Sequence, residues 1–120
     1  MIQKIEINGL HTTVDDDLRK YVNKKIGKLD SYMPRHARPS AHADVKLIES
    51  KIKAKKQCTC EVIMHLPGET LMTKETTMNM FAAVDIVEAK LKNQLKKYKD
   101  THNSRKLHRR VLSRFLRSRG

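Results

Sequence analysis

Lysines recur at helical spacing in two stretches of the chain, and closely spaced ammonium groups are suited to binding a polyanion. In the first stretch, Lys20, Lys24 and Lys28 follow one another at intervals of four residues. Side chains at this spacing lie above one another on a helix, so we expect a ridge of like charge. Within this helix, no acid four residues away relieves the ridge except at its ends.

A second lysine-rich stretch, residues 80–98, carries an apolar stripe at helical spacing and predicts an amphipathic helix. Either lysine face alone is explained equally well by a solvated helix surface. Two such faces on adjacent helices, together with a basic tail, favour binding to RNA or DNA instead. The lysines of the second helix fall on two flanks: Lys92, Lys96 and Lys99 on one, and Lys90 and Lys97 on the other.

The last twenty residues, 101–120, contain seven Lys and Arg residues and no acid. Leu107, Val111 and Phe115 repeat every four residues, so the segment could form a basic amphipathic helix. It is short and self-repelling, and we therefore predict a tail that is disordered or helical only when bound. An interfacial membrane helix is the alternative for this tail. The tail residues expected to contact RNA are Arg105, Arg109 and Arg110.

Gly27 lies in the middle of the first predicted helix, just before the last lysine of the ridge. A glycine inside a helix costs about 1 kcal/mol relative to alanine, so its presence asks for a reason. We predict that Gly27 lies on the exposed side of the helix, where bare backbone would let a phosphate chain approach closely. A glycine with no such role is an equally good interpretation.

The residues that could support catalysis or metal binding do not form a recognisable site. Cys58 and Cys60 share one face of a predicted strand, and a zinc site would need two further ligands, so we expect both in the core. Three acids at residues 15–17 are explained by helix capping and by the helix dipole rather than by a carboxylate site. The sequence contains none of the common phosphate-loop or nucleophile motifs. We predict a protein that is not an enzyme, with no cofactor, no metal and no small-molecule substrate.

Charge is the outstanding feature of the composition. The chain has 26 Lys and Arg residues against 13 Asp and Glu, a net charge of +13 and a pI near 10.0. This balance favours nucleic acid or an anionic membrane as partner. No run of about 20 apolar residues is present to span a membrane, and the N-terminus lacks a secretory signal pattern. We therefore expect a cytoplasmic protein without a membrane partner.

The order of periodic segments predicts an α+β fold of the type β-α-β-β-β-α, a four-stranded sheet with two helices packed on one face. Residues 1–100 form one domain and residues 101–120 the tail. Residues 49–57, rich in lysine, could be strand ends or a mobile loop. The expected strands are 3–9, 41–48, 57–65 and 70–76, and the expected helices are 16–33 and 80–98.

The predicted mode of binding follows from the residue types on the helices. Base-edge readout favours Arg, Asn or Gln at a helix tip, and single-strand binding favours exposed aromatic residues on a sheet. A lysine-dominated helical surface instead predicts phosphate contact and recognition of shape, with folded RNA as the natural target. A general double-stranded-RNA-binding protein or RNA chaperone is the alternative function.

Two motifs resemble a known family. "NMFAAVD" at 79–85, followed by "KLKNQLKKYK" at 90–99, resembles the signature DMYAAID…KLxRQxxKxK of the ribosome hibernation-promoting factor and ribosome-associated inhibitor A family. "DLRKYVNKKIGKLDSYM" at 17–33 is similar to the first helix of that family. The resemblance covers about residues 1–100 and fades beyond them. Asn79 stands where the family has Asp, and Asn93 where it usually has Arg.

The resemblance implies a fold similar to double-stranded-RNA-binding domains, and the short form of the family without its dimerisation domain. It implies binding to the rRNA of the small ribosomal subunit, in the decoding channel over the tRNA and mRNA sites of idle ribosomes under stress. Occupancy alone would inhibit translation, with the whole ribosome as partner and a monomer away from it. The lysines that match the family's RNA contacts are Lys25, Lys28, Lys90, Lys97 and Lys99.

Overall fold

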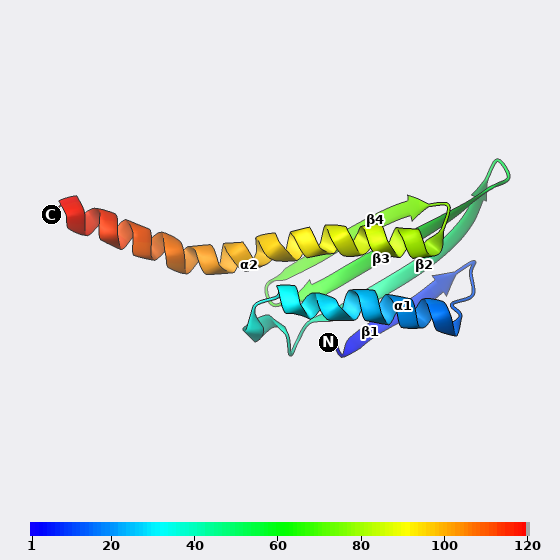
Figure 1. Cartoon of the computed structure of the whole chain (residues 1–120), viewed down its shortest axis with the longest axis horizontal. Coiled ribbons are helices and arrows are strands. Elements are labelled where there is room, and N and C mark those ends of the chain that lie inside the picture. The colour runs from blue at the N-terminus through cyan, green and yellow to red at the C-terminus, as the bar shows by residue number, and fades with distance from the viewer. Residues whose placement is uncertain (120) are drawn as a thin grey trace.

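The computed structural model describes residues 1–119, and the side chains of residues 1–101. Figure 1 shows one sheet with two helices, in the predicted order of elements. The elements are β1 (Lys4–Leu10), α1 (Asp16–Gly27), the 3₁₀ helices η1 (Lys28–Tyr32) and η2 (Arg35–Ala37), β2 (His42–Ile52), β3 (Lys55–Leu66), β4 (Glu69–Thr77) and α2 (Met80–Arg119).

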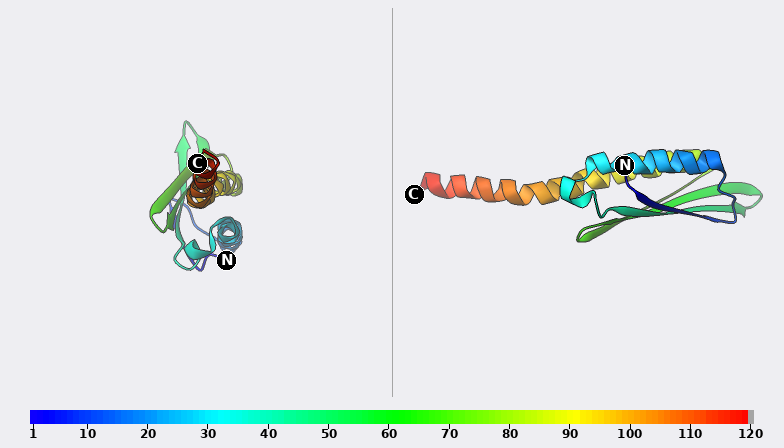
Figure 2. Two further views of the ribbon diagram at one scale, coloured as in Figure 1. Left: turned by 90° about the vertical axis from the view of Figure 1, so that its left-hand side faces the viewer. Right: turned by 90° about the horizontal axis from the view of Figure 1, so that it is seen from below.

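The four strands form one mixed sheet in the order β1-β2-β3-β4. β1 and β2 are parallel because α1 carries the chain back across the sheet between them, whereas the later strands are joined as antiparallel hairpins. Both helices cover the same face, which leaves the other face open (Figure 2). The predicted fold class, an α+β sheet with two helices on one face, is confirmed.

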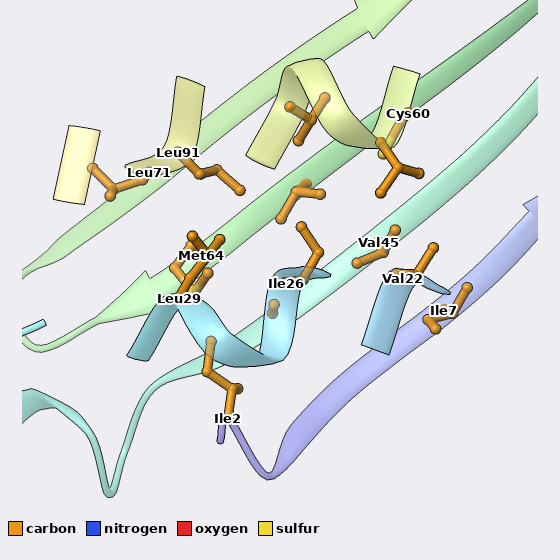
Figure 3. Close-up of a cluster of buried hydrophobic side chains, with 14 of the residues drawn as sticks. Ile2, Ile7, Val22, Ile26, Leu29, Val45, Cys60, Met64, Leu71 and Leu91 are labelled. Carbon is orange, nitrogen blue, oxygen red and sulfur yellow. The ribbon is translucent and has the colours of Figure 1, made fainter. Parts of the chain in front are cut away.

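The core lies between the helices and the covered face of the sheet (Figure 3). Alternation along the strands and the 3.6-residue period of the helices direct the apolar side chains into this layer. Cys58 and Cys60 are both buried there, as predicted, and burial raises the pKa of the Cys60 thiol to about 12. The largest fully buried side chains include Ile26, Leu29, Met33, Leu47, Met64, Leu91 and Leu95.

Both helices begin at a side-chain cap. The Asp15 carboxylate accepts a hydrogen bond from the Leu18 amide at 2.8 Å, so the capping interpretation of this acidic segment is confirmed. The Asn79 side chain accepts from the Phe81 amide at 2.8 Å. Asparagine therefore caps α2 at the position where the family signature quoted above has Asp.

The prediction that Gly27 is exposed was wrong. Gly27 is buried at the end of α1, because the N-terminal residues fold over it. Its carbonyl accepts a hydrogen bond from the Ile2 amide at 3.0 Å, and a Cβ at this position would lie 2.7 Å from the Met1 Cε. The chain terminus is held further by Asp30, whose carboxylate lies 2.9 Å from the Met1 amine. The absent side chain makes room for the N-terminus and leaves no bare backbone for a phosphate chain.

The lysine-rich connector is a pair of strand ends. β1 pairs with β2 only as far as Ile48, and β4 pairs with β3 only from Cys58 onward. Residues 49–57 therefore form a two-stranded extension, which we call the β2–β3 ribbon, and it projects beyond the outer strands (Figure 1).

α2 continues past the sheet as a single helix of 40 residues, so the backbone of 101–119 is helical (Figure 2). The side chains of Arg105, Arg109 and Arg110 lie outside the described residues, and their RNA contacts stay a prediction. Among the described residues, no helix combines the length and the apolar character needed to cross a bilayer.

Candidate nucleic-acid interface

The outward side of the helix layer carries nine lysines from α1, η1 and α2. α1 presents its ridge to solvent because Leu18, Val22 and Ile26 turn the opposite side of the helix into the core. The apolar stripe of α2, which includes Leu91 and Leu95, is buried in the same way and leaves the lysines of this helix facing solvent. We call these nine residues the helix-face lysines: Lys20, Lys24, Lys25, Lys28, Lys90, Lys92, Lys96, Lys97 and Lys99.

Two acids of α2 form ion pairs with lysines of α1 and η1. The Lys25 ammonium lies 3.5 Å from a carboxylate oxygen of Asp85 and 3.5 Å from one of Glu88. The Lys28 ammonium lies 3.9 Å from the other oxygen of Glu88, whose side chain is only 16% exposed. The Glu88 carboxylate raises the pKa of Lys25, which keeps that ammonium charged. These pairs connect the two helices.

An aromatic pair lies beside this network. The Tyr21 hydroxyl donates a hydrogen bond to Asp85, and this bond raises the pKa of Tyr21. The Tyr21 ring meets the Phe81 ring edge-on, with 5.0 Å between centroids. Asp85 of α2 thus contacts two side chains of α1, those of Lys25 and Tyr21, and so helps to join the two helices.

The opposite flank of α2 is tied to the sheet. Lys90 forms an ion pair with Glu75 of β4. The predicted flanks of α2 therefore face different neighbours, with Lys90 toward β4 and Lys92 toward η1. On that second side, the Lys92 and Lys96 ammonium groups lie 5.0 Å and 6.0 Å from the centroid of the Tyr32 ring.

Four helix-face lysines have no acid within ion-pair distance among the side chains that the structure describes. They are exposed, and they come from both helices: Lys20 and Lys24 from α1, Lys97 and Lys99 from α2. Lys92 and Lys96 keep their charge available as well, because an aromatic face orients an ammonium group without neutralising it. These six lysines can therefore bind phosphates without first breaking an ion pair within the protein.

The acids that form ion pairs with the helix-face lysines were not predicted from the sequence. Asp85 and Glu88 are three residues apart and lie on the flank of α2 that faces α1, a spacing visible in the sequence. Their lysine partners are distant along the chain, so helix-by-helix reasoning could not pair them. Glu75 lies on a strand and gave no such signal.

Among the side chains that the structure describes, the histidines and cysteines do not assemble into a site of their own. On the open face of the sheet, the rings of His42 and His65 stack with centroids 4.4 Å apart, and His65 Nε2 lies 3.0 Å from a carboxylate oxygen of Asp44. The cysteines lie in the core on the other side. Within the described residues, no three His, Cys, Asp or Glu side chains are placed to hold a metal ion.

The chain matches one protein-family model over residues 5–103, described as "Sigma 54 modulation protein / S30EA ribosomal protein". Two curated relatives named "Ribosome hibernation promotion factor" align over 100 residues each. The protein of Lactococcus lactis is 34% identical and that of Staphylococcus aureus 33%, and each alignment covers 83% of this chain. It covers 51% and 50% of those relatives, so the chain spans about half their length.

Solved structures show the same fold. The N-terminal domain of Thermus thermophilus protein Y superposes with a TM-score of 0.60 at 27% identity, covering 81% of this chain and 97% of that domain. A ribosomal subunit interface protein from Coxiella burnetii gives 0.62 at 26% identity, with 81% and 98% covered. These matches and the family model confirm the resemblance drawn from the two helix motifs. The chain therefore belongs to the family of sigma 54 modulation proteins and S30EA ribosomal proteins.

Proposed function

We propose that this protein binds the ribosome and holds it inactive, through contacts between the helix-face lysines and rRNA of the small subunit. Occupancy of the decoding channel, over the tRNA and mRNA sites, would block initiation. Its curated relatives are named as ribosome hibernation promotion factors, and one structural neighbour as a ribosomal subunit interface protein. The protein would act as a monomer and without catalysis, since binding alone excludes the competing ligands.

The observation that carries this proposal is the set of exposed, unpaired lysines on two adjacent helices. Each ammonium that meets a phosphate releases a condensed counterion, so affinity should fall steeply as salt rises. Both helices pack on one core, so the backbone beneath Lys20, Lys24 and Lys97 is supported by the fold. A rigid array of charges suits a folded RNA, whose phosphates are themselves fixed in space.

Charge reversal of the unpaired lysines tests the proposal directly. The triple variant Lys20→Glu, Lys24→Glu, Lys97→Glu should lower affinity for purified small subunits by at least about tenfold at moderate salt. Lys25, Lys28 and Lys90 are poor choices, because their reversal would bring like charges against Asp85, Glu88 or Glu75 and disturb the fold. The readouts are cosedimentation in sucrose gradients and the salt dependence of Kd.

A matched control lies on the open face of the sheet. Lys4, Lys46 and Lys74 are exposed there, and their reversal to Glu changes the net charge by the same amount. Because Lys46 and Lys74 lie opposite Glu61 in the ladder, thermal unfolding checks that this control keeps its fold. If both triple variants lose the same affinity, attraction depends on net charge and the helix-face interface is wrong. If wild-type protein does not cosediment with small subunits or whole ribosomes, the function is wrong.

Competition separates ribosome binding from the alternative of general RNA binding. Naked duplex RNA should displace the protein from small subunits only at a large molar excess, since the proposed target is one folded site. Equal competition per phosphate would favour a double-stranded-RNA-binding protein or RNA chaperone instead.

A further inference from the structure

The β2–β3 ribbon is the part of the described sheet with the least structural support. Its two strands pair only with each other, and residues 50–56 are exposed at every position. Figure 2 shows the hairpin extending past the ends of both helices. Ile52 is 54% exposed, so its side chain does not anchor the ribbon in a core. An isolated two-stranded hairpin is marginally stable at best in water.

Charge repulsion adds to this weakness. The ribbon carries Lys51, Lys53, Lys55 and Lys56, and Lys51 lies directly opposite Lys56 in the ladder. Like charges placed opposite each other destabilise a strand pair. Glu49 forms an ion pair with Lys56, with 3.2 Å between carboxylate oxygen and ammonium, and it attracts Lys51 more weakly from beyond ion-pair distance. Within the described residues, the other three lysines have no acid at ion-pair distance.

The turn at the tip is strained as well. Lys53 and Ala54 have φ angles of 53° and 65°, both in the left-handed region. Two-residue hairpin turns of this kind favour Asn-Gly, because a side chain with a Cβ costs about 1–2 kcal/mol per residue there. The sequence instead places a lysine at the first of these two positions. Strain, repulsion and missing core support therefore occur together within nine residues.

We propose that the β2–β3 ribbon is a second RNA-binding element, in which Lys51, Lys53 and Lys55 contact phosphates of the rRNA beyond the reach of the helix-face lysines. The proposal rests on the ribosome-binding function proposed above. Folding stability does not explain the residues of the ribbon, since each of the three features opposes it. A polyanion explains them, because phosphates would neutralise the opposed lysines. Lysine on exposed strands also discourages aggregation, but that role requires neither a strained turn nor a pair of facing lysines.

An RNA partner fits the ribbon better than an acidic protein does. Protein interfaces rely on buried aromatic or arginine anchors, and the ribbon offers neither. Phosphate contact needs only exposed ammonium groups, which the ribbon provides. The ribbon also continues the same sheet that supports the helices, so one large RNA can meet both surfaces.

Neutralisation of the ribbon tests the proposal in the full chain. The variant Lys51→Gln, Lys53→Gln, Lys55→Gln should bind small subunits about tenfold more weakly at moderate salt. The slope of log affinity against log salt should become shallower by about two to three, close to one for each phosphate that the variant no longer binds. The matched control is Lys4→Gln, Lys46→Gln, Lys74→Gln on the open face, which should change neither quantity by as much. Thermal unfolding of both variants checks that the fold is kept.

The outcomes separate the two proposals. If the ribbon variant keeps wild-type affinity and slope while reversal of Lys20, Lys24 and Lys97 abolishes binding, the ribbon proposal is overturned and the proposed function stands. If wild-type protein does not bind ribosomes, both are overturned. A photo-crosslinking residue at Ile52 should attach to rRNA, and attachment to ribosomal protein alone would overturn the RNA assignment.

Discussion

Lysines of the helix layer and lysines of the β2–β3 ribbon carry the same charge in different surroundings. On the helix layer, Lys25 and Lys28 form ion pairs with acids of α2, and the backbone beneath them packs on the hydrophobic core. On the ribbon, Lys51 and Lys55 rest on two strands alone. The charge of the helix layer is therefore partly used inside the molecule, whereas that of the ribbon is directed almost wholly outward.

This difference indicates that residue type alone does not define a cationic interface. Three helix-face lysines, Lys25, Lys28 and Lys90, form ion pairs with acids of the same chain. Such pairs hold the ammonium groups in place and offset part of their attraction for phosphate. The unpaired lysines can contribute their whole charge. A map of ion pairs is thus needed before lysines are ranked for mutation.

The largest expected effect concerns the core that supports only one of the two regions. Leu91→Ala removes a fully buried side chain between α2 and the sheet and should lower the free energy of unfolding by about 2–5 kcal/mol. Ile52→Ala on the ribbon should change it by no more than about 0.5 kcal/mol. Urea denaturation followed by circular dichroism measures both. Similar losses for the two variants would show that the ribbon is part of the cooperative core.

Alkaline pH provides a second probe of the core. Burial raises the pKa of the Cys60 thiol to about 12 in the folded state, above its ordinary value near 9. The folded protein therefore binds more protons than the unfolded chain between these values, and stability falls as pH rises through them. Relative to Cys60→Ala, which does not titrate, wild-type protein should lose about 1 kcal/mol of unfolding free energy by about pH 10. A constant difference between the two proteins across this pH range would show that the thiol is accessible to water.

Glu88→Gln should separate stability from binding in the helix layer. The substitution keeps the size of the side chain but removes the charge shared by Lys25 and Lys28. The melting temperature should fall by a few degrees at most, while affinity for small subunits rises severalfold with a steeper salt dependence. Glu61→Gln on the open face is the matched control for net charge. A fall in affinity would mean that Glu88 positions these lysines for RNA more than it competes for them.

The order of elements and the helix caps could be predicted because their signals are local. Asp15 and Asn79 each precede an apolar stripe, and strand residues such as Val45 and Val62 alternate with polar ones. A short window of sequence contains these patterns in full, since capping and alternation involve neighbouring residues. The two-helix arrangement then followed from the need to bury each stripe.

Features that depend on distant residues could not be predicted in this way. Gly27 is buried by Met1 and Ile2, which no helix pattern connects to it. The acid partners of Lys25 and Lys90 lie on other elements, so the division of the lysines into paired and unpaired groups appears only in the fold. The ribbon has no apolar alternation, and its strands form because β2 and β3 continue an existing ladder. Of the candidate interface, the helical faces were thus foreseen and the ion pairs were not.

The smallest expected effect tests whether the ribbon turn is strained. Ala54→Gly replaces a residue at φ 65° with one that tolerates this angle, which should relieve about 1–2 kcal/mol. Glycine also gains freedom in the unfolded chain, which costs about 0.5–1 kcal/mol. The variant should therefore be more stable by about 0.5 kcal/mol, measured by urea denaturation.

The control for this variant is Ala89→Gly, at an exposed position of α2, which should instead be destabilised by about 1 kcal/mol. If Ala54→Gly is destabilised to the same extent, the turn is not strained. Because Ala54→Gly keeps every lysine, its affinity for small subunits should equal that of wild-type protein. Weaker binding of this variant would mean that the strained turn itself fixes the ribbon lysines for contact with phosphate.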